Sequence, residues 1–71
     1  MPTTINIWVN QKEQQYIAPL TLLGLLQQIN KAEKTGIAIA VNNSVIPKIK
    51  WQDLDLKDQD KVTIITATQG G

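Results

Sequence analysis

Apolar residues follow two different periods along this chain, and together they predict strands at both ends with a helix between them. Residues 4–9 alternate between apolar and polar side chains, which is the period of a strand with one buried face. A polar, turn-like segment at 10–13 leads into a second extended segment at 14–18. The chain is therefore predicted to open with a β-hairpin.

Helical spacing begins after Thr21, whose side chain is a natural N-cap for the exposed amides of a first turn. The apolar stripe of this helix consists of Leu22, Leu25, Leu26 and Ile29. Lys31 and Lys34 suit the negative end of the helix dipole, and Gly36 is a good left-handed terminator. The helix is predicted to run from Leu22 to about Lys34.

The next segments predict a second pair of strands. An apolar run at 37–41 is typical of a buried central strand. Asn42 and Asn43 tolerate positive φ and are expected to turn the chain into a short extended segment at 44–46. Pro47 has no N–H to donate, so pairing should end there.

The last part of the chain predicts a connection and a final strand. Residues 48–56 are interpreted as a connection with a helical turn, pinned by the apolar anchors Trp51, Leu54 and Leu56. A turn at 57–60 precedes a strand at 61–67. Its alternation places Val62 and Ile64 inward and Thr63 and Ile65 outward.

The order of elements, β-β-α-β-β-β, indicates the α+β class, with one helix laid across one face of a mixed sheet. The helix stripe should bury against the inward positions Ile5, Ile7, Val9, Ile39, Val41, Val62 and Ile64. We expect one domain over residues 1–67, followed by a flexible, extended tail over 68–71. If the last strand is central, the tail leaves from a rigid base and reaches roughly 13 to 14 Å beyond it.

Composition excludes several classes of function. The chain has 71 residues, enough for one domain with a small core. Its 7 Lys+Arg and 6 Asp+Glu give a net charge of +1 with no long charged block, so neither nucleic acid nor a membrane surface is an expected partner. Without Cys or His it lacks a thiol nucleophile, the usual zinc ligands and the commonest general base. For want of these groups we expect the protein not to be an enzyme. We expect it in the cytoplasm, because the sequence shows no membrane-spanning run and no signal peptide.

The sequence ends in Gly70-Gly71. Glycine has no Cβ, so such an end can pass through a channel too narrow for any side chain. This property suits a terminus that enters the active site of another protein. The alternatives are a frayed chain end or residues left by a cloning junction.

Several pieces, in this order and spacing, carry a family resemblance: the early strand ending in Asn10, the helix start Thr21-Leu22-x-x-Leu25-Leu26, the run Val41-Asn42-Asn43-Ser44-Val45-Ile46-Pro47-Lys48 followed by Trp51, the acidic turn Asp58-Gln59-Asp60, and Gly70-Gly71. The chain resembles, essentially end to end, the ubiquitin-like sulfur carriers of β-grasp fold, and most closely the ThiS family of thiamin biosynthesis. It departs from the family pattern at Gln59, where glycine is usual. If Gln59 keeps a positive φ, the substitution costs about 1 kcal/mol.

The resemblance implies that the reactive group is the α-carboxylate of Gly71, carried on a tail of Thr68, Gln69 and Gly70. A terminal carboxylate is ionised and inert at neutral pH, so it must be activated from outside. By resemblance, a ThiF-like enzyme adenylates it with ATP and Mg²⁺, and a sulfur donor such as a persulfide enzyme displaces AMP to leave a thiocarboxylate. That sulfur would then enter the thiazole ring on a ThiG-like thiazole synthase. The chain itself is expected to bind no cofactor and no metal.

Docking to these partners is expected on the outward face near the last strand, where Ile65 and Trp8 are predicted to project beside one another or nearly so. Each has a second interpretation: Ile65 as sheet-surface packing, and Trp8 as partial packing within the domain. Trp51 is interpreted as a plug at the edge of the core. The acidic residues at 53, 55, 58 and 60 match no Ca²⁺ loop, and turn chemistry explains them.

Two other functions remain open at this stage. A molybdopterin-type sulfur carrier shares the same logic, although the Asn-x-x-x-(Val/Ile)-Pro-basic-x-x-Trp segment at 42–51 favours the thiamin carrier by resemblance. A plain β-grasp interaction module that binds RNA or a protein is the second alternative, with the glycines incidental.

Overall fold

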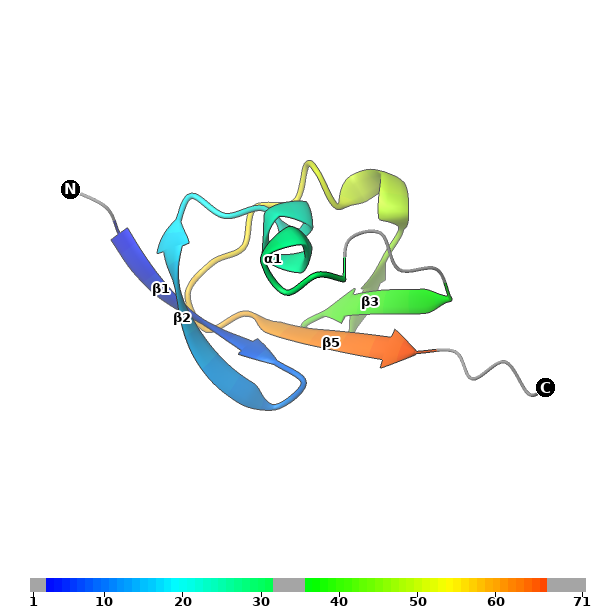
Figure 1. The fold of residues 1–71 in the computed structure, drawn as a ribbon, viewed down its shortest axis with the longest axis horizontal. Coiled ribbons are helices and arrows are strands. Elements are labelled where there is room, and N and C mark those ends of the chain that lie inside the picture. The colour runs from blue at the N-terminus through cyan, green and yellow to red at the C-terminus, as the bar shows by residue number, and fades with distance from the viewer. Residues whose placement is uncertain (1–2, 32–35, 67–71) are drawn as a thin grey trace.

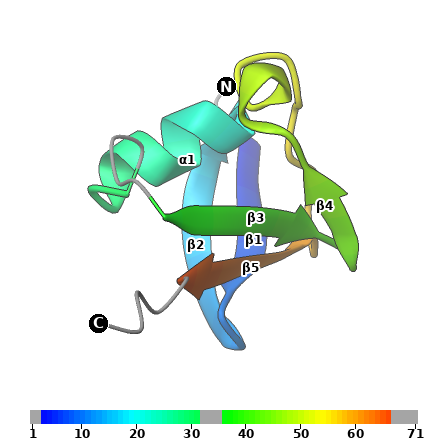
Figure 2. The ribbon, with the colours of Figure 1, turned by 90° about the vertical axis from the view of Figure 1, so that its right-hand side faces the viewer.

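The computed structural model describes residues 3–31 and 36–66, which form one five-stranded mixed sheet with an α-helix across one face (Figure 1). The elements are β1 (Thr3–Val9), β2 (Lys12–Ala18), α1 (Leu22–Gln28), β3 (Ile37–Val41), β4 (Ser44–Ile46), the 3₁₀ helix η1 (Lys48–Lys50) and β5 (Lys61–Thr66). Figure 2 shows α1 and the η1 connection on the same side of the sheet. The predicted α+β class and the β-grasp arrangement are confirmed.

The last strand, β5, is the central strand of the sheet, whose order is β2-β1-β5-β3-β4. It runs parallel to β1, with Trp8 opposite Lys61 and Val9 opposite Val62. It runs antiparallel to β3 over five residue pairs, from Val41–Val62 to Ile37–Thr66. The last strand is thus central, which was the condition for the predicted tail to leave from a rigid base.

Both hairpins close through two residues in the left-handed region. Asn10 and Gln11 have φ of 49° and 71°, and Asn42 and Asn43 have φ of 51° and 71°. Positive φ at both central residues is the requirement of a type I′ turn, whose twist matches that of the flanking strands. The first turn is consequently shorter than predicted, because β2 already begins at Lys12 rather than after residue 13.

The helix ends earlier than predicted, at Gln28 rather than near Lys34. The Asn30 backbone turns left-handed, with φ of 61°, and its N–H donates to the Gln27 carbonyl at 3.2 Å. The Lys31 N–H donates to the Leu26 carbonyl at 2.7 Å, which completes a Schellman motif. Asparagine thus supplies the terminator that had been assigned to Gly36, and Gly36, also left-handed at φ 73°, instead precedes β3. Lys34 lies outside the described residues.

The core lies between α1 and the sheet. The helix begins where Thr21 was expected to cap it, with the Gly24 N–H donating to Thr21 Oγ1 at 3.0 Å. The predicted stripe residues Leu22, Leu25 and Leu26 are fully buried. They pack in one cluster with Ile5, Ile7, Tyr16, Leu20, Ile39, Val41, Trp51, Leu56 and Val62. No helix in the described part of the chain has the length and apolar character needed to cross a membrane.

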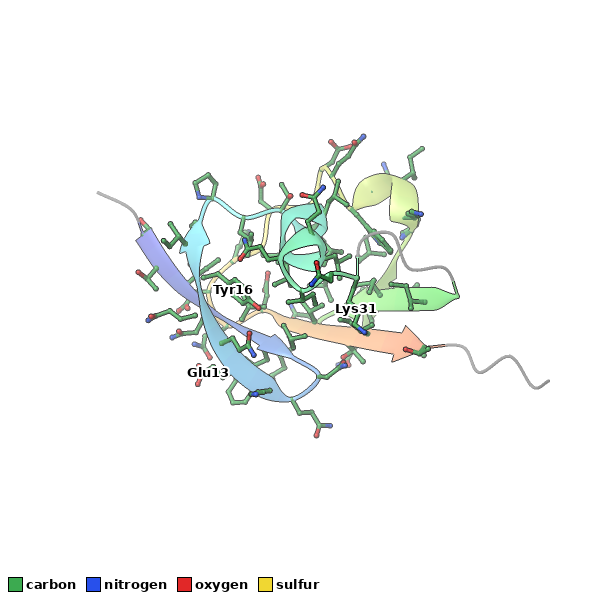
Figure 3. All side chains as sticks on the ribbon, in the orientation of Figure 1. Glu13, Tyr16 and Lys31 are labelled. Carbon is green, nitrogen blue, oxygen red and sulfur yellow. The ribbon has the colours of Figure 1, made fainter. Side chains whose placement is uncertain are left out.

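Two aromatic residues close the edges of this core. Trp51 is buried, and its Nε1–H donates to the Ile46 carbonyl at 3.0 Å, so its interpretation as a plug is confirmed. Tyr16, labelled in Figure 3, is buried on β2 and donates its hydroxyl hydrogen bond to Gln14 Oε1 at 3.0 Å. Burial raises the pKa of the Tyr16 phenol, because the charged phenolate is poorly solvated there.

Candidate functional site

The residues predicted to carry the chemistry, Thr68, Gln69, Gly70 and Gly71, lie outside the described residues, as does the domain boundary at Ala67. The structure describes the base from which they continue. That base is β5, whose first inward residue, Val62, is fully buried beneath α1. Its last described residue, Thr66, pairs with Ile37 of β3.

Two asparagines from the hairpin turns hold β5 from both sides. The Asn10 N–H donates to the Val62 carbonyl at 2.9 Å, and its side-chain Oδ1 accepts from the Ile64 N–H at 2.8 Å. On the other side, the Asn42 N–H donates to the Lys61 carbonyl at 2.8 Å, and Asn42 Oδ1 accepts from the Lys61 N–H at 3.0 Å. Sequence reasoning assigned both residues to turns and missed these bonds, which depend on the spatial neighbours of each turn.

The acidic turn before β5 is tied to its surroundings by its own carboxylates. Asp58 Oδ1 accepts from the Asn6 N–H at 2.7 Å, while Asp60 accepts from the Lys57 N–H at 2.8 Å and from Asn42 Nδ2 at 2.9 Å. Turn chemistry thus accounts for Asp60, as predicted, whereas the Asp58 side chain bonds outside the turn, to β1. Among the described residues, no three Asp, Glu, His or Cys side chains gather into a group that could hold a metal ion.

Gln59, which lies between these two aspartates, keeps a positive φ although it stands where the resembled family usually has glycine. Its φ is 71°, so this non-glycine residue occupies the strained left-handed region. The Gln59 N–H donates to the Asn6 carbonyl at 2.6 Å, and its side chain accepts from Trp8 Nε1 at 3.3 Å. The turn before β5 is therefore held against β1 despite the strain.

The two residues predicted for partner contact share the sheet face opposite α1, but they are not neighbours. Trp8 lies opposite Lys61, whereas Ile65 lies four residues further along β5, which corresponds to roughly 13 Å. The prediction that they project beside one another is therefore wrong, because the parallel register sets Trp8 against the start of the strand. Trp8 is half-buried, in keeping with partial packing in the domain, and Ile65 is 49 % exposed.

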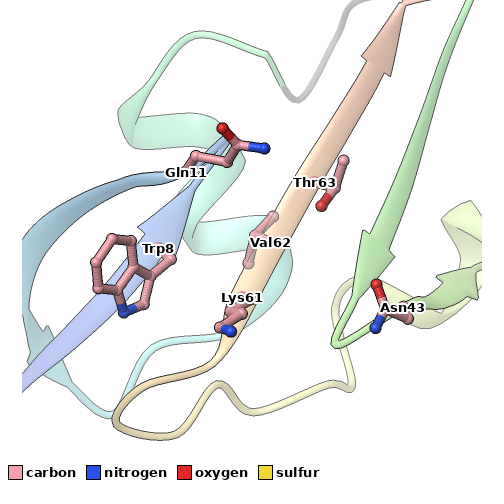
Figure 4. Close-up of a pocket in the computed structure, with 6 residues that line it drawn as sticks. All are labelled: Trp8, Gln11, Asn43, Lys61, Val62 and Thr63. Carbon is pink, nitrogen blue, oxygen red and sulfur yellow. The ribbon is translucent and has the colours of Figure 1, made fainter.

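Each end of this outer face has its own character. Near Trp8, a hollow of about 390 Å³ is lined by Trp8, Gln11, Asn43, Lys61, Val62 and Thr63 (Figure 4). Near Thr66, Ile65 pairs across the strands with Ala38, and both side chains are exposed. The end of the face next to the predicted tail is thus apolar, and the far end mixes an indole with amide, hydroxyl and ammonium groups.

Comparison with known proteins gives consistent results over almost the whole chain. The ThiS family model matches residues 5–71. A sulfur carrier protein ThiS from Escherichia coli (strain K12) is 27% identical over 67 residues, covering 94% of this chain and 100% of that one. The uncharacterized protein ycf40 of Porphyra purpurea is 34% identical over 67 residues, covering 94% and 93% of the two chains.

The fold matches a solved structure of the same description. The crystal structure of a thiamine biosynthesis protein (ThiS) from Geobacter metallireducens superposes with a TM-score of 0.80 at 23% identity, covering 94% of this chain and 100% of that chain. At this identity the likeness establishes the shared fold. The family match, by contrast, extends through Gly70 and Gly71.

Proposed function

The chain belongs to the ThiS family, and from this premise we propose that it is a sulfur carrier of thiamin biosynthesis whose reactive group is the α-carboxylate of Gly71. The observation that carries the proposal is the family match over residues 5–71, which includes the Gly-Gly segment. The position of β5 supports it, because a central strand gives the following residues a fixed point of departure. The curated Escherichia coli relative is itself described as a sulfur carrier.

The proposed chemistry takes place on the tail and is performed by partners. A ThiF-like enzyme binds ATP and Mg²⁺, the Gly71 carboxylate attacks the α-phosphorus, and pyrophosphate leaves to give an acyl-adenylate. Sulfur from a donor such as a persulfide enzyme then attacks the acyl carbon and AMP leaves. With a persulfide donor, a thiol must cleave the remaining S–S bond to release the thiocarboxylate. The carboxylate needs this activation because it is ionised and unreactive at neutral pH.

The domain contributes positioning and docking in this scheme. The carrier acts as a cosubstrate of the adenylating enzyme and of a ThiG-like thiazole synthase, which receives the sulfur. We assign docking to the outer face next to β5, where Ile65 is half exposed and Trp8 presents part of its indole. Ile65 and Trp8 lie toward opposite ends of this face, and partly exposed aromatic and apolar side chains of this kind can anchor a protein interface.

Intact mass spectrometry of the protein from cells that contain the native pathway tests the function. We expect a mature chain that ends at Gly71, in which a fraction of molecules carries one sulfur in place of a terminal oxygen. A chain that continues past Gly71, or one that never carries the sulfur in active cells, would contradict the proposal. The sulfur should also disappear when the adenylating enzyme is deleted, because activation must precede transfer.

A matched set of tail variants tests the assignment of Gly71. Deleting Gly71 should abolish adenylation while leaving the fold intact, because the carboxylate is then one residue short of the activating site. Thr68→Ala is the control, since it changes a tail side chain but preserves the length. Supplying the wild-type chain to cells that lack their own thiamin carrier, and to cells that lack their own molybdopterin carrier, separates the two carrier pathways. A β-grasp interaction module would be indifferent to the deletion.

A further inference from the structure

The central strand β5 extends beyond the end of its neighbour β1. The two strands pair only where Trp8 faces Lys61 and Val9 faces Val62, because the chain turns away at Asn10 and Gln11 into β2. On its other side, β5 remains paired with β3 as far as Thr66. The last residues of β5 are therefore paired on the β3 side and unpaired on the β1 side. We call this unpaired side the open edge.

The hydrogen-bond pattern identifies the backbone groups on this open edge. Because the Asn42 N–H donates to the Lys61 carbonyl, the alternation of an antiparallel pair turns the N–H and C=O of Thr63 and Ile65 toward β3. Ile64 and Thr66 consequently direct theirs the other way. The Ile64 N–H is bonded to Asn10 Oδ1 at 2.8 Å. No described residue hydrogen-bonds to the Ile64 carbonyl or to the Thr66 N–H.

The open edge lacks the features that normally discourage strand addition. Of the two outer strands, β2 starts with the charged residues Lys12 and Glu13, and β4 is only three residues long and is followed by Pro47; both features protect a free edge. The open edge of β5 presents backbone groups of Ile64 and Thr66, both β-branched and uncharged. Ile65 beside it is half exposed. A backbone segment from outside can therefore approach this edge without meeting a charge on β5 itself.

We propose that an extended main-chain segment of the adenylating partner adds to the sheet at this edge, parallel to β5, donating to the Ile64 carbonyl and accepting from the Thr66 N–H. This inference rests on the proposed function. The parallel direction fits because one residue of a parallel strand bonds to both groups, whereas an antiparallel pair with Ile64 needs the N–H that Asn10 already occupies. Main-chain pairing of this kind is a recurring mode of recognition at exposed sheet edges.

The occupant follows from where the open edge lies. Its last group, the Thr66 N–H, lies two residues before Thr68, the first residue of the tail that carries the reactive carboxylate in the proposed function. A partner strand here would fix the direction in which that segment leaves the sheet. The enzyme that receives the tail is thus the expected occupant, because a strand bound here would direct the tail toward its active site.

Amide hydrogen exchange tests the proposal directly. The chain, labelled with ¹⁵N, is measured alone and saturated with its ThiF-like enzyme without ATP. The Thr66 amide should exchange about fivefold more slowly in the complex, since a new hydrogen bond contributes on the order of 1 kcal/mol. The control is the Gln15 amide. Gln15 lies opposite Asn6, whose N–H and carbonyl bond to the acidic turn and not to β2, so the Gln15 N–H faces the outer edge of the sheet. Unchanged exchange at Thr66, or equal slowing at both amides, would overturn the inference.

A proline substitution tests the same bond by kinetics. Thr66→Pro removes the N–H at the open edge and no bond to β3, so it should raise the KM for adenylation about three- to tenfold relative to Thr66→Ala. Gln15→Pro removes an equivalent N–H from β2 and should leave KM unchanged. If Thr66→Pro fails to fold, a chemically synthesised chain with an ester in place of the Thr66 amide replaces it.

The outcomes separate the two proposals. A wild-type chain that is never adenylated contradicts the proposed function, whatever happens at Thr66. A wild-type chain that is adenylated, with the same KM after Thr66→Pro or the ester as after Thr66→Ala, contradicts the strand addition alone.

Discussion

Replacing Gln59 with glycine should stabilise this protein, because the backbone of Gln59 is strained. Its φ of 71° lies in the left-handed region, where a residue with a Cβ costs roughly 1 to 2 kcal/mol. Glycine removes that cost but gives back roughly 0.5 to 1 kcal/mol, because its unfolded chain is more flexible. The lost side chain matters little, since its bonds to Trp8 and Glu13 are long, at 3.3 and 3.5 Å, and exposed.

The net gain on Gln59→Gly therefore lies between about 0 and 1.5 kcal/mol of unfolding free energy, with a midpoint of about 0.75 kcal/mol. For a chain of 71 residues this midpoint corresponds to a rise in Tm of roughly 3 to 6 °C, measured by circular dichroism or calorimetry. The backbone bond from the Gln59 N–H to the Asn6 carbonyl is kept in the variant. The turn before β5 should thus retain its position.

Gln59→Ala is the control that isolates the backbone term. Alanine removes the same side-chain hydrogen bonds but keeps the Cβ, and with it the strain, so its Tm should lie at or below that of the wild type. The difference between the glycine and alanine variants then reports the cost of the left-handed φ less the entropic cost of the more flexible glycine. If Gln59→Gly melts no higher than Gln59→Ala, the strain reasoning is wrong.

Two further predictions concern bonds that position the helix and β5, and a third concerns the buried phenol of Tyr16 on β2. Thr21→Ala should lower the unfolding free energy by about 1 kcal/mol in urea denaturation, because the Gly24 N–H loses its cap. Asn10→Gly keeps the positive φ but removes the side-chain acceptor, so the Ile64 amide should exchange at least about threefold faster, while Asn10→Asp, which keeps an acceptor, should protect it. Burial raises the pKa of Tyr16 in the folded state, so the unfolded chain loses this proton first and stability falls as pH rises above about 10. Tyr16→Phe should remove that part of the fall in urea titrations across this range.

Most of the fold could be predicted from the sequence because its local signals agree with its packing. The alternation in residues 4–9, the Leu22 stripe and the run at 37–41 each lead to the element they predict, since burial and local propensity favour the same structure. The end of the helix could not be predicted as well. Asn30 and Gly36 are both able to adopt positive φ, and pattern alone gave no reason to prefer the earlier residue.

The candidate site was less predictable, because its geometry depends on strand register. The sequence placed Trp8 and Ile65 on one face, but only the pairing of Trp8 with Lys61 reveals that they lie far apart along it. The role of Asn10 was hidden for a similar reason. Its side chain bonds to Ile64, which is 54 residues away in the sequence, and a turn asparagine carries no local signal of such a contact.

The uneven support of β5 connects the fold with the proposed function. At its start, Asn42 and Asn10 bond to it from opposite sides, and the acidic turn is fixed to β1 through Asp58. Toward Thr66, β3 is the only described strand beside it. A strand held on both sides at one end cannot swing, so it defines where the tail begins. At its other end the same strand is open on one side, so its main-chain groups can still bond to a partner. A strand paired on both sides along its whole length would have no such groups free.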